Sequence, residues 1–183
     1  MRTSDSDILI IPGLGGSGPD HWQTRWESKL STARRVEQAD WHQPDLDAWV
    51  QRIVEQVAAS ERPVILVAHS LGVWAVAQAA AKLDQSKVKG ALLVAPVDAE
   101  QIRAHEKIDS RFAEMEHGKL PFPAVLVGSQ NDPYASIEAS KALADKLGAE
   151  FLDAGEAGHI NAESGHGPWP EGLMRFAGFL RSL

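Results

Sequence analysis

Three side chains that could together carry out nucleophilic catalysis follow one another along the chain as Ser70, Asp132 and His159. A serine hydroxyl is a poor nucleophile at neutral pH and needs a neutral imidazole to take its proton. That imidazole needs a carboxylate, which fixes its tautomer and stabilises its charged form. Each role can be filled once, so we expect these side chains to act together on a carbonyl group.

The stretch around Ser70 carries the strongest of the three signals. An apolar, β-branched run at 63–68 predicts a buried strand, and the series at 73–81 predicts a helix. A serine at such a strand-to-helix turn has its hydroxyl exposed, provided that the residues two before and two after it are small. Ala68 and Gly72 meet this requirement. The alternative, a serine that only caps a helix, does not need the preceding strand.

An attacked carbonyl becomes an oxyanion, which two backbone N–H groups can stabilise. The amide of Leu71 at the start of the predicted helix is one candidate donor. The second is expected from the glycine-rich loop at 12–19, which follows the apolar run at 8–11, with Leu14 as the first choice. This loop lacks both the Gly-Lys-Ser/Thr ending and the G-x-G-x-x-G spacing of nucleotide-binding loops.

The aspartate and the histidine have competing interpretations. Asp132 lies in an Asn-Asp-Pro sequence and could simply form a turn. His69 adjoins the serine but is expected to point away, whereas His105 falls in a predicted lid and His166 shares the loop of His159. No two histidines have H-E-x-x-H spacing, and the chain has no cysteine, so we expect neither a metal nor a cofactor.

Strands and helices must alternate to place these residues. We expect strands at 8–11, 34–38, 63–68, 90–96, 124–127 and 150–152, and helices from Pro19, at 45–57, at 73–81, at 136–147 and from Pro170. This order is typical of an α/β fold, a doubly wound, mainly parallel sheet of about six strands with helices on both faces. Ser70, Asp132 and His159 then all follow carboxyl ends of strands, where such sheets bind ligands.

Three further side chains are candidates for the walls of a substrate pocket. His21 and Trp22 come directly after the glycine-rich loop, and Trp169 lies beyond His159. Trp22 also begins a four-residue spacing with Trp26 and Leu30, which favours a core-facing helix stripe for the last two.

The charged segment at 97–120 lacks a clear period and predicts a short helical lid. With so small a lid, we expect a shallow pocket for a short apolar acyl or aryl group.

Length and charge narrow the classes of function further. The 183 residues predict a single domain spanning 1–183, and the apolar run at 8–11 is too short for a secretory or membrane segment. We therefore expect a soluble, cytoplasmic protein, with a monomer favoured. The formal charge of −7, with scattered Lys and Arg, argues against nucleic-acid or membrane partners and leaves a small-molecule ester as the expected partner.

Several separated motifs resemble those of one family, the small serine hydrolases of the YdeN and retinoblastoma-binding protein nine type. They are Pro-Gly-x-Gly-Gly-Ser with His21-Trp22-Gln23, His69-Ser70-Leu71-Gly72, Asn131-Asp132-Pro133-Tyr134, Gly158-His159-Ile160-Asn161 and Gly167-Pro168-Trp169-Pro170-Glu171-Gly172. The resemblance implies a compact α/β-hydrolase fold with a minimal cap, and a triad of Ser70, Asp132 and His159 in preference to His166. Ala68 departs from the general hydrolase pattern, which has glycine there.

The residues and the resemblance together favour a serine hydrolase of the carboxylesterase class. It would cleave small carboxylic esters, or as a second choice amides, through an acyl-serine intermediate. A non-catalytic protein-interaction module on the same scaffold is the alternative, because fold alone does not fix function. A complete, ordered triad favours the enzyme.

Overall fold

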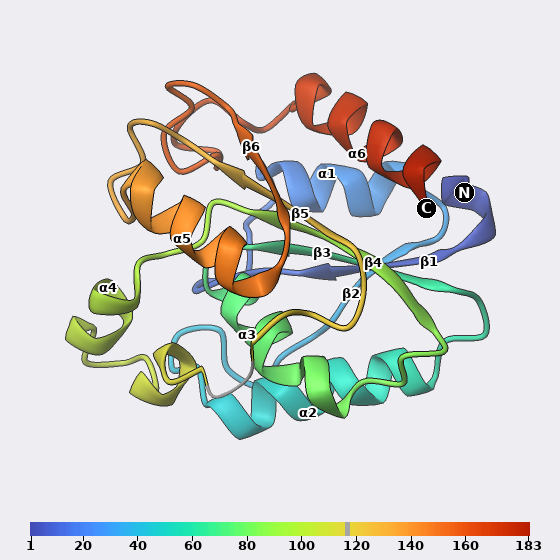
Figure 1. The fold of residues 1–183 in the computed structure, drawn as a ribbon, viewed down its shortest axis with the longest axis horizontal. Helices are drawn as coiled ribbons and strands as arrows, with labels where there is room; N and C mark the ends of the chain where they lie inside the picture. Colours follow the sequence, from blue (N-terminus) through green and yellow to red (C-terminus); the bar gives the residue numbers. More distant parts are fainter. Residues whose placement is uncertain (116–117) are drawn as a thin grey trace.

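A six-stranded parallel sheet forms the centre of the molecule, which we describe from a computed structural model that covers residues 1–115 and 118–183 (Figure 1). The strands run in the order β2-β1-β3-β4-β5-β6 across the sheet. In chain order they are β1 (Asp7–Ile11), β2 (Ala33–Arg35), β3 (Val64–His69), β4 (Val88–Val94), β5 (Ala124–Gly128) and β6 (Glu150–Asp153). The predicted α/β fold is confirmed.

The order in which strands are added to the sheet reverses between β1 and β3, although all strands are parallel. From β1 the chain first goes outward to the edge strand β2, and it then crosses back to β3 and continues to β6. Open α/β sheets bind ligands beyond the carboxyl ends of their strands at such a reversal. The glycine-rich loop follows β1 and Ser70 follows β3, so both lie at this point.

Helices cover both faces of the sheet. They are α1 (Trp22–Lys29), α2 (Leu46–Ala58), α3 (Leu71–Ala79), α4 (Ala99–Ala104), α5 (Ile137–Leu147) and α6 (Pro170–Ser182). Helices α1 and α6 lie together on one side of the sheet (Figure 1), where one apolar core joins them to it. The core on the other face contains side chains of α2, α3 and α5. Strands β3 and β4 are buried along nearly their whole length because both faces are covered.

Two element boundaries differ from the predictions. Helix α1 begins at Trp22 and not near Pro19, because the His21 side chain accepts a hydrogen bond from the Gln23 amide and caps the helix there. Strand β2 is shorter than the predicted 34–38, although it forms the edge of the sheet as its polar sequence suggests.

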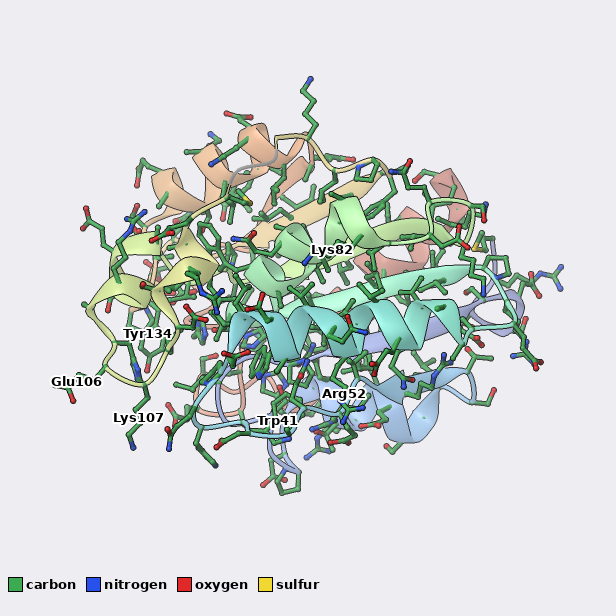
Figure 2. All side chains as sticks on the ribbon, turned by 90° about the horizontal axis from the view of Figure 1, so that it is seen from below. Trp41, Arg52, Lys82, Glu106, Lys107 and Tyr134 are labelled. Carbon is green, nitrogen blue, oxygen red and sulfur yellow. The ribbon has the colours of Figure 1, made fainter. Side chains whose placement is uncertain are left out.

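The predicted lid consists of two short helical pieces, α4 and the 3₁₀ helix η3 (Ser110–Ala113), which we call the cap segment, residues 97–115. Residues 116 and 117 of the predicted lid lie outside the described part. Ile102 and Phe112 are fully buried and attach the segment to the core. Figure 2 shows Glu106 and Lys107 at its outer end, with Tyr134 beside it.

The two ends of the chain meet on one side of the molecule (Figure 1). The amino group of Met1 donates to the Leu180 carbonyl at 2.7 Å. Among the described residues, no helix combines the length and the apolar character that crossing a membrane requires.

Candidate active site

The turn at Ser70 is a single residue wide. Strand β3 ends at His69 and helix α3 begins at Leu71, so Ser70 alone reverses the chain, with φ 56° and ψ −123°. A non-glycine residue in such a conformation costs on the order of 1–3 kcal/mol and persists only where its surroundings enforce it. The Ser70 amide donates to the Val94 carbonyl of β4 at 3.0 Å, which holds the turn against the sheet.

Small residues make this turn possible. A Cβ atom on Gly72 would collide with the Ile11 carbonyl, and one on Gly13 would lie 2.8 Å from Cβ of Ser70. The loop after β1 therefore passes directly beside the serine. Ala68 is fully buried within β3, and the sheet accommodates its methyl group where the general pattern has glycine.

The structure brings Ser70, His159 and Asp132 into one chain of hydrogen-bonding distances. Nε2 of His159 lies 3.0 Å from the Ser70 Oγ atom, and its Nδ1 lies 3.0 and 2.9 Å from the two Asp132 carboxylate oxygens. Because a carboxylate only accepts, Nδ1 carries the proton and Nε2 keeps a lone pair facing the serine hydroxyl. The histidine and aspartate side chains are 9% and 2% exposed.

The turn that carries Asp132 and the loop that carries His159 fix one another. The Asn131 side-chain oxygen accepts the Gly158 amide at 2.7 Å, next to the histidine. Asp132 itself also accepts the Tyr134 amide at 2.9 Å. Asp132 therefore both stabilises its turn and contacts His159.

His69 has a position that the sequence did not suggest. It points away from the serine hydroxyl, as expected, but its Nε2 donates to the His159 carbonyl at 2.9 Å. The next carbonyl, that of Ile160, accepts from the Trp22 indole at 2.9 Å. Two buried side chains from β3 and α1 thus hold the backbone of the loop that presents His159, where Ile160 has a φ of 46°.

The expectation that Trp22 and Trp169 line the pocket is wrong. Trp22 is fully buried and Trp169 is 4% exposed, and their rings pack 4.9 Å apart in the core beneath α6. Trp22 is the first residue of α1 and shares the inward stripe of Trp26, with rings 4.8 Å apart. The four-residue spacing in the sequence was the signal for this packing.

The other two histidines considered as partners of the serine form hydrogen bonds with other groups, although His105 lines a cavity that also contains Ser70. His166 Nδ1 makes a 3.1 Å hydrogen bond with the Ser164 hydroxyl. His105 is exposed at the end of α4, where its Nδ1 accepts the Lys107 amide at 3.3 Å.

Leu14 and Leu71, expected to stabilise the oxyanion, both lie beside the serine. Leu71 begins α3, so its amide has no acceptor within the helix. Within the described residues, the Leu14 amide donates to no backbone carbonyl. Both N–H groups are thus free to donate to a ligand.

The glycine-rich loop is held from its outer side. The Arg35 guanidinium donates to the carbonyls of Gly16 and Ser17, the second at 3.1 Å, and pairs with Glu27 at 3.0 Å. The Ser17 hydroxyl donates to the fully buried Gln23 side chain at 2.7 Å. These contacts fix the carbonyls of Gly16 and Ser17 in the loop that passes beside Ser70.

Two cavities meet at Ser70. The first, of about 360 Å³, is lined by the glycine-rich loop, by His21 and His69, and by residues 161–163. The second, of about 300 Å³, extends under the cap segment, where apolar side chains such as Leu71, Val97 and Ile108 share its lining with polar ones. Ser70, His159 and Leu14 line both cavities. His21 is therefore in the cavity wall, where it was expected.

His21 and His69 in the wall of the first cavity are held neutral. Burial lowers the pKa of His21 to about 4, with smaller contributions from the nearby His159 and Arg35. Burial also lowers the pKa of His69 well below its usual value, and His159 and His21 add to the effect. Among the described residues, no cluster of three histidine, aspartate or glutamate side chains could hold a metal ion.

Comparisons with known proteins identify the family and the fold of this chain. A model of the serine hydrolase family matches residues 8–178. YdeN of Bacillus subtilis strain 168 is 26% identical over 168 residues, which cover 86% of this chain and 87% of YdeN. Its crystal structure matches with a TM-score of 0.74 at 18% identity, over 97% of this chain and 99% of that one. A YdeN-like protein from Pectobacterium atrosepticum is 35% identical with a TM-score of 0.84, over 97% of this chain and 91% of that one. The chain therefore belongs to the serine hydrolase family and has the α/β-hydrolase fold.

Proposed function

We propose that this hydrolase is a carboxylesterase that cleaves small esters through an acyl intermediate on Ser70. The observation that carries the proposal is the unbroken chain from the Ser70 hydroxyl through His159 to Asp132, at distances of 2.9 to 3.0 Å. A module used only for protein interaction would not need this arrangement. The proposed chemistry uses no cofactor and takes a small molecule as substrate.

In the acylation step the Ser70 oxygen attacks the ester carbonyl while His159 Nε2 takes the hydroxyl proton. Asp132 stabilises the imidazolium that forms, and the amides of Leu14 and Leu71 donate to the oxyanion. His159 then gives its proton to the departing alcohol. In the second half a water molecule repeats the attack on the acyl-serine, which releases the acid and restores the hydroxyl.

The second cavity favours a short acyl group. Leu71, Val97 and Ile108 contribute to its lining, and the cap segment that covers it consists of only two short helical pieces. Each buried methylene contributes about 0.8 kcal/mol to binding, whereas one that projects into water contributes nothing. We expect kcat/KM to rise from acetyl to about butyryl esters and then to level off or fall.

Labelling with a fluorophosphonate, which forms a covalent bond with activated serines, tests the proposal. The probe should modify Ser70 and no other residue, and Ser70→Ala should lose both labelling and hydrolysis of p-nitrophenyl butyrate. The turnover number should fall by roughly four to six orders of magnitude. His166→Ala should keep both properties. Labelling of another residue, or activity that survives Ser70→Ala, would overturn the acyl-Ser70 mechanism.

A further inference from the structure

Two neighbouring residues at the end of β3 contact His159 at two different points. The Ser70 Oγ atom lies 3.0 Å from Nε2 of the His159 ring, and Nε2 of His69 lies 2.9 Å from the His159 backbone carbonyl. Because a carbonyl oxygen only accepts hydrogen bonds, Nε2 of His69 carries the proton and donates it. The end of β3 thus holds both the ring and the backbone of the histidine that serves as base in the proposed mechanism.

The surroundings of His69 suit a residue that holds the base without exchanging protons itself. Its side chain is buried, and burial lowers its pKa well below the usual value, so the ring stays neutral. The ring centroids of His69 and His159 are 4.8 Å apart. A charged ring at this distance would disfavour the imidazolium that forms on His159 during the reaction, whereas a neutral ring does not.

Trp22 holds the next peptide group of the same loop. Its indole N–H donates to the Ile160 carbonyl at 2.9 Å, and its backbone amide donates to the His166 carbonyl at 3.2 Å. The first residue of α1 therefore contacts the loop at two places, which are six positions apart in the chain. Trp22 is fully buried, so solvent does not compete for its indole N–H.

The backbone at these contacts has an unfavourable conformation. Ile160 has a φ of 46°, which is rare for a β-branched residue. Such a conformation persists only where the surrounding structure enforces it. The carbonyls of residues 159 and 160 are the two that accept from His69 and Trp22. Loss of either donor lets this segment relax, which moves the His159 ring relative to Ser70.

We infer that His69 and Trp22 are positioning residues for the proposed hydrolysis. By holding two successive carbonyls of the loop, they keep Nε2 of His159 within reach of the Ser70 hydroxyl proton. A displacement of about 1 Å in a reacting group can lower a rate by roughly 100-fold. This inference rests on the proposed esterase function and identifies what holds the base of that site in place.

Two substitutions at position 69 separate the N–H donor from the ring. His69→Gln keeps a donor but has no ring, and His69→Phe keeps a ring but has no donor. The turnover number for p-nitrophenyl butyrate should fall by roughly 100-fold in His69→Phe and by less than about tenfold in His69→Gln. KM should change by less than about threefold in both, because the loss is in proton transfer and not in binding. Circular dichroism and thermal denaturation establish that each variant is folded.

Trp22→Phe tests the second donor and decides the question if His69→Phe does not fold. It keeps an aromatic ring in the core but removes the N–H that holds the Ile160 carbonyl. Trp26→Phe is the matched control, since the Trp26 ring packs 4.8 Å from that of Trp22 and its indole N–H has no partner among the described residues. The turnover number should fall at least roughly tenfold further in Trp22→Phe than in Trp26→Phe. The rate of fluorophosphonate labelling of Ser70 should fall in parallel.

The outcomes distinguish this inference from the proposed function. No hydrolysis together with no labelling of Ser70 in the wild-type protein would overturn the proposed function. With an active wild type, a loss in His69→Gln as large as that in His69→Phe would overturn only this inference, because the ring and not the donor would then matter. The same holds if Trp26→Phe loses as much as Trp22→Phe, or if the folded variants change in KM alone.

Discussion

The glycine-rich loop and the cap segment border the same serine but are held in different ways. The loop is fixed by buried polar contacts: the Gln23 side chain is fully buried and the Arg35 side chain is 13% exposed. The cap segment is attached by two fully buried apolar side chains, Ile102 and Phe112, and by hydrogen bonds from Gln78 to three of its carbonyls. Its ion pairs, from Arg111 to Asp47 and Asp109, are at the surface.

This difference indicates that the loop and the cap segment have different functions in the site. Stabilising an oxyanion needs donors that are already in place, because reorganisation during the reaction would add to the barrier. Accommodating different acyl chains needs only an apolar surface of suitable size. Surface ion pairs contribute little because water and salt screen them. Changes in the glycine-rich loop and in the residues that hold it should therefore alter the reaction rate or the stability. Changes in the cap segment should alter only substrate preference.

The largest effect is expected for Asp132→Asn, which removes the carboxylate that orients the base. The turnover number for p-nitrophenyl butyrate should fall by roughly 10⁴-fold, because an amide no longer enforces the His159 tautomer. Circular dichroism should show that the fold is retained. A loss of less than about tenfold would show that Asp132 acts only in its turn.

The next effect concerns stability at acidic pH. The folded protein should become less stable as the pH falls, because it keeps the buried His21 neutral. The unfolded chain binds a proton to this histidine below about pH 6.5, whereas the folded chain binds it only near pH 4. Stability from this group is therefore complete above the first value and falls as the pH drops towards the second. The loss amounts to about 3 kcal/mol in the free energy of unfolding.

Urea denaturation at pH 7 and at pH 4.5 checks this expectation. The wild-type protein should lose more stability between the two values than His21→Asn does. His42→Asn, which changes an exposed histidine, is the matched control and should behave as the wild type. Equal losses in His21→Asn and the wild type would show that this histidine is not the source.

A smaller effect, roughly tenfold in kcat/KM, is expected for Arg35→Ala, because Arg35 acts through the loop and not on the substrate. The loss should be mainly in the turnover number, and added guanidinium should restore part of it. Arg34→Ala is the matched control. Arg34 precedes Arg35 on β2 and pairs with Asp7 of β1 at 3.3 Å, but it does not contact the loop. A change only in KM, or an equal loss in Arg34→Ala, would contradict the positioning role.

The smallest effect belongs to the cap segment. Ile108→Ala enlarges the second cavity and should move the preferred acyl length from about butyryl towards hexanoyl. The acetyl ester should change by less than about threefold, since a methylene is worth only about 0.8 kcal/mol. Leu173→Ala on α6, away from both cavities, should leave the chain-length profile unchanged. A large loss with all esters would show that the cap segment shares in the chemistry.

The sequence by itself was sufficient for the features that depend on neighbouring residues. Apolar runs that alternate with helical spacings predicted the six strands and the helices between them. Strands of a parallel sheet that are covered on both faces consist mainly of apolar residues, which produces such runs. The turn at Ser70 was recognisable since its close approaches require small residues at fixed positions. Placing three candidate residues after strand ends followed from the parallel topology alone.

Only the tertiary structure decided questions that involve distant segments. It placed His159, not His166, against Ser70, because contacts between the turns after β5 and β6 set the path of that loop. It buried Trp22 and Trp169, since their rings pack against one another and against Trp26 in the core between α1 and α6. The contact of His69 with the His159 carbonyl joins residues 90 positions apart. No local pattern encodes such a contact, because it arises only when two strand ends meet at one edge of the sheet.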